Sequence, residues 1–244
     1  MATYNFNTSS VQTKAGQRSL LSKTFTYMAI FLGITAAVTF SLAFLLDHFI
    51  VTEGGRIPSA YIGLMIGSGV AQIFLTLWIF LGCLRPGKIQ IIPMILYSVC
   101  MGVLMSSFTF ALKPTTLGCA FLIAALSFGG MALIGAFSKN ASGLGMVGFG
   151  LLFSILFTLC FSWIFFLFVP EAMRGLNIAI CAIVVIAVLC ITAYDVNNIV
   201  RISKAGENSS NLALYLAFNL YTDFILILIR IIQLIIIVTG GDRR

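Results

Sequence analysis

Charged side chains are scarce in this sequence: Asp, Glu, Lys and Arg make up 9% of the residues. Soluble domains carry about 25%. Hydrophobic residues, by contrast, make up 60%. A chain with so little charge cannot cover a folded core with a hydrated surface, so an ordinary soluble domain is excluded.

Histidine is almost missing, and cysteine has no metal-binding pattern. His48 is the single histidine, and all six cysteines fall within apolar runs without close ligand spacing. We therefore expect the cysteines to be small buried apolar side chains and expect no cofactor. Basic residues are scattered at one or two per loop, so no nucleic-acid surface is predicted. The cysteines are Cys83, Cys100, Cys119, Cys160, Cys181 and Cys190.

Long apolar runs fill most of the chain, and about twenty such residues are enough to cross a bilayer as a helix. They are too long for barrel strands and lack the alternation of such strands. The sequence predicts an all-α membrane protein, a seven-transmembrane-helix bundle over residues 24–238, with tails at 1–23 and 239–244. The runs are Thr24–Leu46, Ala60–Leu84, Ile89–Leu112, Pro114–Ser138, Asn140–Pro170, Gly175–Tyr194 and Leu212–Val238.

The distribution of Lys and Arg between the runs predicts the orientation. Eight lie in the N-terminal tail and in the loops on its side, and three lie in the loops on the other side. By the positive-inside rule the N-terminus is cytoplasmic, and we expect a multi-pass protein of a bacterial inner membrane. The last run either crosses the bilayer or dips in and returns. The two sets are Lys14, Arg18, Lys23, Arg85, Lys88, Lys139, Arg201 and Lys204 against Arg56, Lys113 and Arg174.

Two aspartates stand out because they lie in or beside hydrocarbon. Asp223 sits near the middle of the last run, and Asp195 ends the run before it, where it could also cap a helix or face water. The other five acidic residues lie in loops or at the tail. A carboxylate in a membrane costs a few kcal/mol and is a functional candidate by default.

Further polar residues share one face of the last run. Asn219 and Arg230 are four residues before and seven residues after Asp223, and Gln233 follows three later, spacings that fall on one helix face together with Tyr215. Such a stripe predicts that the last helix is central. Asp223 and Arg230 are separated by about 10.5 Å along a helix, so an ion pair between them would be strained.

A pair of nearby carboxylates has a specific chemistry. Both cannot stay ionised cheaply, so Asp195 and Asp223 would titrate as a coupled unit. A proton or Ca²⁺ would relieve the repulsion, because hard cations prefer carboxylate oxygens. Competition between the two predicts a pH-gated cation path with transient Ca²⁺ binding at both aspartates.

Enzyme alternatives fit less well. Intramembrane aspartyl proteases pair a Tyr-Asp motif, matched by Tyr194-Asp195, with a Gly-x-Gly-Asp motif, but Asp223 has no such glycines before it. A serine protease would need a Gly-x-Ser-Gly site, and Ser142 lacks the first glycine. We expect a protein that is not an enzyme.

Glycine clusters predict helix contacts, since small residues let backbones approach in membranes. One is the GxxxG pair Gly63 and Gly67, with Gly69 close by. The other comprises Gly143, Gly145, Gly148 and Gly150, which lack the strand and Lys-Ser/Thr pair of a phosphate loop.

The C-terminal motif resembles that of the Bax inhibitor-1 family. It runs from about Ile191 to Leu228, through Thr192-Ala193-Tyr194-Asp195 and the Asn219-Leu-Tyr-Thr-Asp223 segment. The resemblance implies seven helices with the last one enclosed, and a pH-sensitive Ca²⁺ leak gated by Asp195 and Asp223. From the polar stripe and the Tyr-Asp pair, we expect Tyr194, Asn219, Arg230 and Gln233 to support this site.

The resemblance also implies a basic residue in the second helix that latches the aspartates. The second run has no Lys or Arg, and Gln72 is its most polar interior residue. Arg56 or Arg230 would have to substitute, or a shared proton alone would close the path. Two other functions stay open: a non-transporting modulator that binds a membrane protease or a component of a cell-death or stress pathway, and a secondary transporter.

Overall fold

A computed structural model describes residues 6–52, 59–83, 91–138, 142–151, 153, 173–205 and 209–239. Within these ranges the regular structure is helical and no strand occurs, which confirms the all-α prediction for the described part of the chain. The chain divides into two compact units. Unit 1 comprises Met1–Phe110 and Asn208–Tyr221, and unit 2 comprises Ala111–Glu207 and Thr222–Arg244. Helix α8 (Ser210–Thr239) contributes residues to both units.

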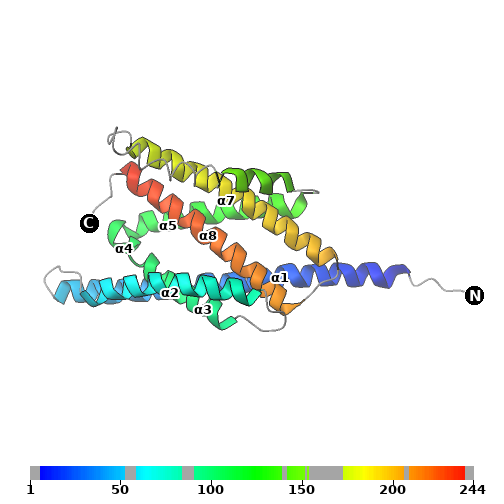
Figure 1. The fold of residues 1–244 in the computed structure, drawn as a ribbon, viewed down its shortest axis with the longest axis horizontal. Coiled ribbons are helices and arrows are strands. Elements are labelled where there is room, and N and C mark those ends of the chain that lie inside the picture. The colour runs from blue at the N-terminus through cyan, green and yellow to red at the C-terminus, as the bar shows by residue number, and fades with distance from the viewer. Residues whose placement is uncertain are drawn as a thin grey trace, which may run out of the picture. The chain divides into compact units, whose positions relative to one another are not determined.

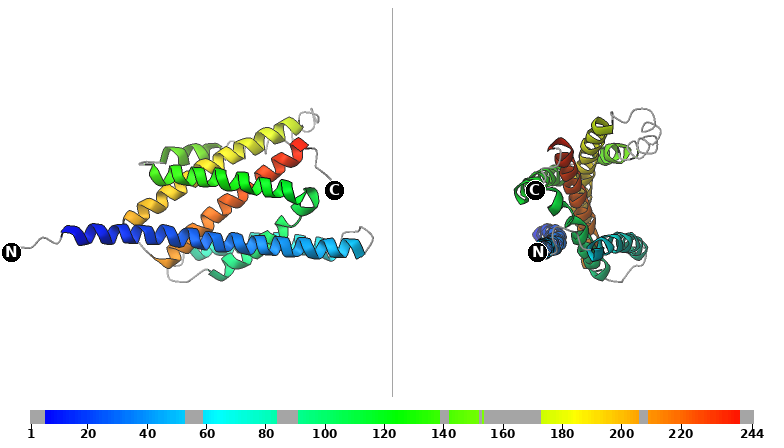
Figure 2. Two further views of the ribbon diagram at one scale, coloured as in Figure 1. Left: turned by 180° about the vertical axis from the view of Figure 1, so that it is seen from behind. Right: turned by 90° about the vertical axis from the view of Figure 1, so that its left-hand side faces the viewer.

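Unit 1 contains α1 (Phe6–Thr52), α2 (Ser59–Cys83), α3 (Ile91–Met105) and most of the short α4 (Phe108–Ala111). Helix α3 packs against both α1 and α2. Figure 2 shows α1, in blue, as one uninterrupted helix. It therefore begins well inside the predicted N-terminal tail, which is helical from Phe6 onward.

The close packing of α1 on α3 depends on Gly102. A Cβ atom at this position would lie 2.7 Å from Cβ of Val38 and 2.8 Å from the carbonyl oxygen of Thr35. The short distance lets Thr39 Oγ1 donate a hydrogen bond to the carbonyl of Gly102 (3.0 Å). Between two apolar helices in a bilayer, small residues and hydroxyl bonds of this kind provide the contact.

Unit 2 contains α5 (Pro114–Phe137), the short apolar helix Ser142–Leu151, α7 (Met173–Lys204) and the C-terminal half of α8. Helix α5 packs against α7; Figure 1 labels both helices. Pro114 begins α5 at its first turn, as the sequence indicates, because a proline there removes no intrahelical hydrogen bond.

Within the described ranges, five helices are long and apolar enough to cross a membrane: Leu20–Leu46, Ser59–Leu81, Thr115–Phe137, Asn177–Lys204 and Ser210–Thr239. They correspond to the first, second, fourth, sixth and seventh predicted runs. Most of the fifth run, Asn140–Pro170, lies outside the described residues apart from the helix Ser142–Leu151.

The third run is not the single helix that we expected over Ile89–Leu112. Helix α3 stops at Met105, and a turn at Ser106 and Ser107 separates it from α4. Both serine hydroxyls donate to carbonyls three residues earlier, at 2.6 Å from Val103 O and 2.7 Å from Leu104 O. Such local bonds compete with the regular helical pattern and tighten the turn. Ser106 also bonds the hydroxyl of Tyr61 on α2 (2.9 Å).

The last run resolves an alternative that the sequence left open. Helix α8 is continuous over 30 residues, a length of about 45 Å at 1.5 Å per residue. A segment that dips into the membrane and returns needs a turn, and α8 has none. The re-entrant alternative is therefore wrong.

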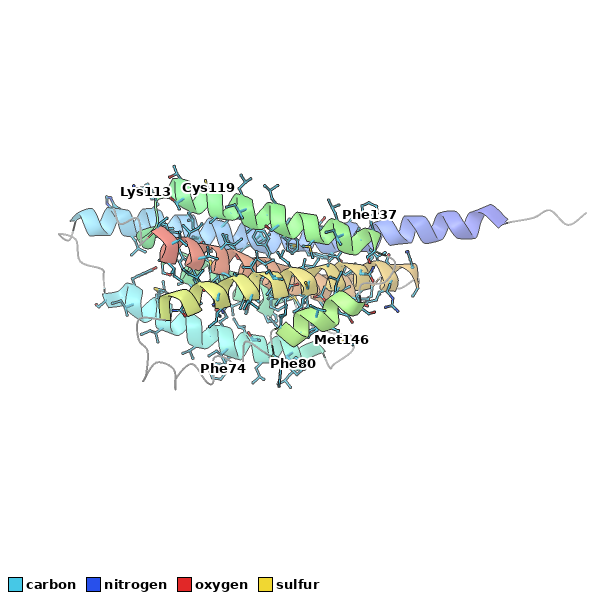
Figure 3. The ribbon with its side chains drawn as sticks, turned by 90° about the horizontal axis from the view of Figure 1, so that it is seen from above. Phe74, Phe80, Lys113, Cys119, Phe137 and Met146 are labelled. Atoms are coloured by element: carbon cyan, nitrogen blue, oxygen red, sulfur yellow. The ribbon has the colours of Figure 1, made fainter. Side chains whose placement is uncertain are left out.

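Large apolar side chains project from the described helices without protein neighbours to cover them. Phe74 and Phe80 extend outward from α2, and Met146 from the helix Ser142–Leu151 (Figure 3); all three are exposed. Water would penalise such a surface, whereas lipid tails accept it. The exposed apolar residues thus agree with a membrane environment.

Two predictions about small residues need correction. Gly63 and Gly67 on α2 are exposed, and a Cβ atom at either would meet nothing within 4 Å, so in the described residues the predicted contact is absent. Among the cysteines Cys181 is buried as expected, but Cys119 on α5 is exposed. A thiol is apolar enough to face lipid, so burial in protein is not required.

Candidate functional site

Asp223 lies in unit 2 on the part of α8 that packs against α7. Its exposed fraction is 9%, and Thr192 of α7 places Oγ1 3.4 Å from Asp223 Oδ2. The neighbouring Phe224 packs edge-on against Phe121 and Phe128 of α5, with ring centroids 5.5 and 5.6 Å apart. The aromatic contacts with α5 and the Thr192 hydroxyl of α7 hold this turn of α8 in unit 2.

Asp195 lies inside α7 and not at its end. The apolar run stops at Tyr194, but the helix continues to Lys204, and the apolar span extends from Asn177 to Lys204. The prediction that Asp195 could cap a helix is therefore wrong. Its side chain is half-buried, and its charge is near enough to act on Asp223.

The structure thus places the two predicted aspartates in one unit, Asp195 on α7 and Asp223 on α8, where Thr192 of α7 lies beside Asp223. Asp223 is buried and Asp195 is half-buried. Such a pair can exchange a proton for a cation, because either one relieves the repulsion between the carboxylates.

Few carboxylate, thiol or imidazole ligands gather around the aspartates in the described part of the chain. Within the described residues no group of three or more His, Cys, Asp or Glu side chains is gathered. Calcium takes six to eight oxygen ligands, and the aspartate pair supplies at most four.

The polar stripe of α8 continues beyond Asp223 in unit 2. Arg230 Nη1 donates to Gln233 Oε1 (2.9 Å), and Cys181 of α7 places Sγ 3.9 Å from the same oxygen. The contact of Arg230 is within its own helix, in agreement with the expected strain of an Asp223–Arg230 pair. Asn219 and Tyr215 belong to unit 1, and both are half-buried and have interaction partners.

The candidate latch residues have other contacts. Gln72 of α2 donates to Sδ of Met101 on α3 (2.9 Å). Arg230 is engaged with Gln233, as above, and Arg56 lies outside the described residues. The predicted substitution of the latch by one of these arginines stays a prediction.

Glycines hold the stretch of α7 that carries the site. Gly145 lies against the ring of Tyr194, and Gly148 against Ile191 and the carbonyl of Ala187. Two of the four glycines of the second predicted cluster therefore make a helix contact, whereas a Cβ atom at Gly143 or Gly150 would meet nothing within 4 Å. Gly135 of α5 lies against the backbone of Ala193, where a Cβ atom would collide with the carbonyl. Sequence spacing did not reveal Gly135, because its role depends on the partner helix.

Asn197, two residues beyond Asp195, was also missed. It is buried, with 4% of its surface exposed, and its Nδ2 donates to the carbonyls of Gly135 (3.0 Å) and Ser138 (2.7 Å). These carbonyls belong to the last turn of α5 and to its C-cap residue, where helical partners run out. The signal available in the sequence was an amide side chain inside an otherwise apolar helix.

A known protein family has a sequence pattern that matches this chain. The family described as "Inhibitor of apoptosis-promoting Bax1" matches residues 17–240, which is nearly the whole chain. The chain belongs to the Bax inhibitor-1 family. The resemblance carried by the Asp195 and Asp223 motifs is thereby confirmed, and with it a membrane protein built of several apolar helices.

A bacterial protein is similar to this chain over about two thirds of its length. The uncharacterized protein YrjE of Lactococcus lactis subsp. lactis (strain IL1403) is 31% identical over 163 residues, which cover 66% of this chain and 67% of the relative.

Proposed function

We propose that this protein is a pH-sensitive Ca²⁺ leak of the membrane, in which Asp195 and Asp223 together form the proton sensor and the gate. The observation that carries the proposal is the placement of both carboxylates in unit 2, one of them with only 9% of its surface exposed and each within the electrostatic reach of the other. A structural role alone would be served more cheaply by apolar side chains.

The chemistry follows from competition for the same oxygens. A proton on the pair removes the repulsion and leaves no charge to attract a cation. When the pair is ionised, it attracts a hard cation such as Ca²⁺. Cation passage is therefore linked to pH through the two aspartates.

The proposal includes seven membrane crossings, an interior α8 and a cytoplasmic N-terminus in a bacterial membrane. The complete burial of Leu220, Tyr221 and Ile227 supports an interior α8. Arg201 and Lys204 are exposed in the last turn of α7, where cytoplasmic charges are expected. Labelling of single cysteines introduced beside Lys204 from each side of the membrane tests the orientation.

Calcium efflux from proteoliposomes tests the function between about pH 5 and pH 8, where a buried carboxylate titrates. The wild type is compared with Asp223→Asn and Asp195→Asn, and with Asp242→Asn, which removes the same charge from the C-terminal tail. We expect the first two variants to lose the pH dependence and the third to keep it. If both site variants retain the wild-type profile, the aspartates are not the sensor.

The same measurement separates the alternatives. A modulator that binds a membrane protease or a stress-pathway component would give no efflux above protein-free liposomes at any pH. A secondary transporter would show Ca²⁺-independent flux that depends on an added solute. Either result would reject the leak.

A further inference from the structure

Helices α5 and α7 touch through their backbones. Gly135 of α5 lies against the carbonyl group of Ala193 on α7, where no side chain separates the two helices. Asn197 of α7 binds the same end of α5, because its Nδ2 donates to the carbonyls of Gly135 (3.0 Å) and Ser138 (2.7 Å). A backbone contact has no rotamers that can adjust, so a shift of either helix would break the contact itself. The two helices therefore form a rigid pair.

The second half of α8 meets this pair in a different way. Thr222–Thr239 contains no glycine and no alanine, so each of its residues carries a longer side chain. The first half of the same helix does contain small residues, Ala213 and Ala217, and both are completely buried. Small residues are what let helix backbones approach closely in a membrane. The second half of α8 therefore packs on its neighbours through side chains.

The polar contacts that Asp223 and Gln233 make with α7 are long. Asp223 Oδ2 lies 3.4 Å from Thr192 Oγ1, and Gln233 Oε1 lies 3.9 Å from Cys181 Sγ. Thr192 has a shorter bond within its own helix, because its Oγ1 donates to Val188 O at 2.9 Å. Thr192 therefore keeps its closer partner if α8 shifts along α7.

Aromatic packing joins the same part of α8 to α5. The ring of Phe224 lies edge-on to those of Phe121 and Phe128, with centroids 5.5 and 5.6 Å apart. Edge-to-face pairs are favourable over centroid separations of about 4.5–7 Å, so these contacts tolerate a small displacement. Packed helices that slide past each other typically move by about 1–2 Å. A slide of that size would keep both ring contacts.

We propose that Thr222–Thr239 is the moving element of unit 2 and slides against α5 and α7, which stay fixed to each other. Asp195 belongs to the fixed pair and Asp223 to the moving helix. A slide of α8 therefore changes the separation of the two carboxylates without a change in the fold of either helix. The inference rests on the proposed function only for its consequence, namely that this movement opens and closes the path. The movement itself can be measured without any flux.

Double electron–electron resonance between two spin labels measures the movement in the full chain in lipid nanodiscs. The labels occupy exposed positions through Leu122→Cys on α5, Arg201→Cys on α7 and Leu226→Cys on α8, and alanine replaces the six native cysteines. Both pairs share the label at Arg201, so its own flexibility contributes equally to each. We expect the α7–α8 distance distribution to be wider than the α5–α7 distribution by about 2 Å, the size of such a slide.

Gly135→Ala and Gly129→Ala are matched perturbations of α5. A Cβ atom at Gly135 would collide with the carbonyl of Ala193, whereas one at Gly129 would meet nothing within 4 Å among the described residues. We expect Gly135→Ala to widen the α5–α7 distribution and Gly129→Ala to leave it unchanged. If the variant without native cysteines does not fold, as judged by circular dichroism and gel filtration, p-acetylphenylalanine at the same three positions carries the labels in the chain with its cysteines.

The outcomes are distinct. Equal widths for the two label pairs would overturn the inference, and so would a Gly135→Ala variant whose α5–α7 distribution is as narrow as that of the wild type. A wide α7–α8 distribution in a protein that releases Ca²⁺ from liposomes supports both proposals. The same distribution in a protein without Ca²⁺ efflux supports the movement and rejects the leak. Equal widths in a protein that releases Ca²⁺ reject the movement and leave the leak standing.

Discussion

The hydroxyl groups of Thr35 and Tyr221 lie 2.7 Å apart and share a hydrogen bond across 186 positions of the sequence. Thr35 Oγ1 also lies 3.0 Å from Phe31 O and 3.1 Å from Ser98 O. The ring of Tyr221 packs edge-on against those of Phe31 and Tyr97, at 5.9 and 6.3 Å between centroids. This cluster joins α1, α3 and the first half of α8 within unit 1.

Tyr221→Phe should destabilise the protein modestly, by about 1 kcal/mol. The variant loses one buried hydrogen bond and keeps the ring, and Thr35 retains two other acceptors, so no donor is stranded. Tyr221→Ala should cost about 3–5 kcal/mol, because it also leaves a cavity. Unfolding in mixed detergent and SDS measures both values. A double-mutant cycle with Thr35→Val should return a coupling near the full cost of the phenylalanine variant; additive costs would contradict the bond.

Gly135→Ala should destabilise the protein by about 1–3 kcal/mol, since the added methyl group would collide with the backbone of Ala193 and force α5 away from α7. Gly129→Ala and Gly130→Ala on the same helix are the controls. Nothing lies within 4 Å of a Cβ atom at either position, so alanine should be neutral or stabilising by up to about 1 kcal/mol. Thermal unfolding in detergent compares the three. Equal effects at all positions would mean that Gly135 makes no special contact.

Asn197→Ala should cost about 1–3 kcal/mol, because it strands two carbonyls of the last turn of α5 in a buried place. Asn198→Ala, at the half-buried neighbouring position, removes the same chemical group and should change stability by less than about 1 kcal/mol. Hydrogen exchange at the C-terminal end of α5 gives the local readout. Faster exchange there is expected in Asn197→Ala and not in Asn198→Ala. Similar exchange in the two variants would refute the cap.

Ser203→Ala should change the stability in the opposite direction. Its hydroxyl is buried, with 3% of the residue exposed, and has no hydrogen-bond partner among the residues that the structure describes. Removing an unsatisfied buried hydroxyl should be neutral or stabilising by about 1 kcal/mol. Ser98→Ala is the comparison: Ser98 is fully buried and donates to Met94 O (3.0 Å), so its loss should destabilise. A destabilised Ser203→Ala in the SDS titration would reveal a partner for this hydroxyl.

Much of the helical framework could be predicted because it depends on local composition. The start of α5 at Pro114 and the extent of α8 follow from proline and from a long apolar run. The proximity of Asp195 and Asp223 was also predictable, since a short loop joins their helices and a buried charge needs a partner. What each aspartate does remains a prediction that the Ca²⁺ efflux experiment addresses.

The residues that sequence reasoning missed are defined by their neighbours. Gly102 and Gly135 each stand without a second glycine four residues away, and their importance lies in the backbone of another helix. The pair Gly63 and Gly67 has the expected spacing and makes no such contact. The turn at Ser106 could not be predicted for a related reason. A serine hydroxyl that bonds its own backbone does not change the hydropathy of the run.

The division of α8 between the two units has a consequence for biosynthesis. Tyr221 and Asp223 are two positions apart, yet the first completes unit 1 and the second completes unit 2. Both units therefore remain incomplete until α8 has left the ribosome. Until then, the helices of both units lack their packing partner α8. A ribosome stalled before Ser210 should leave two unfinished units in the bilayer, exposed together to quality-control proteases, and not one finished unit beside one unfinished unit.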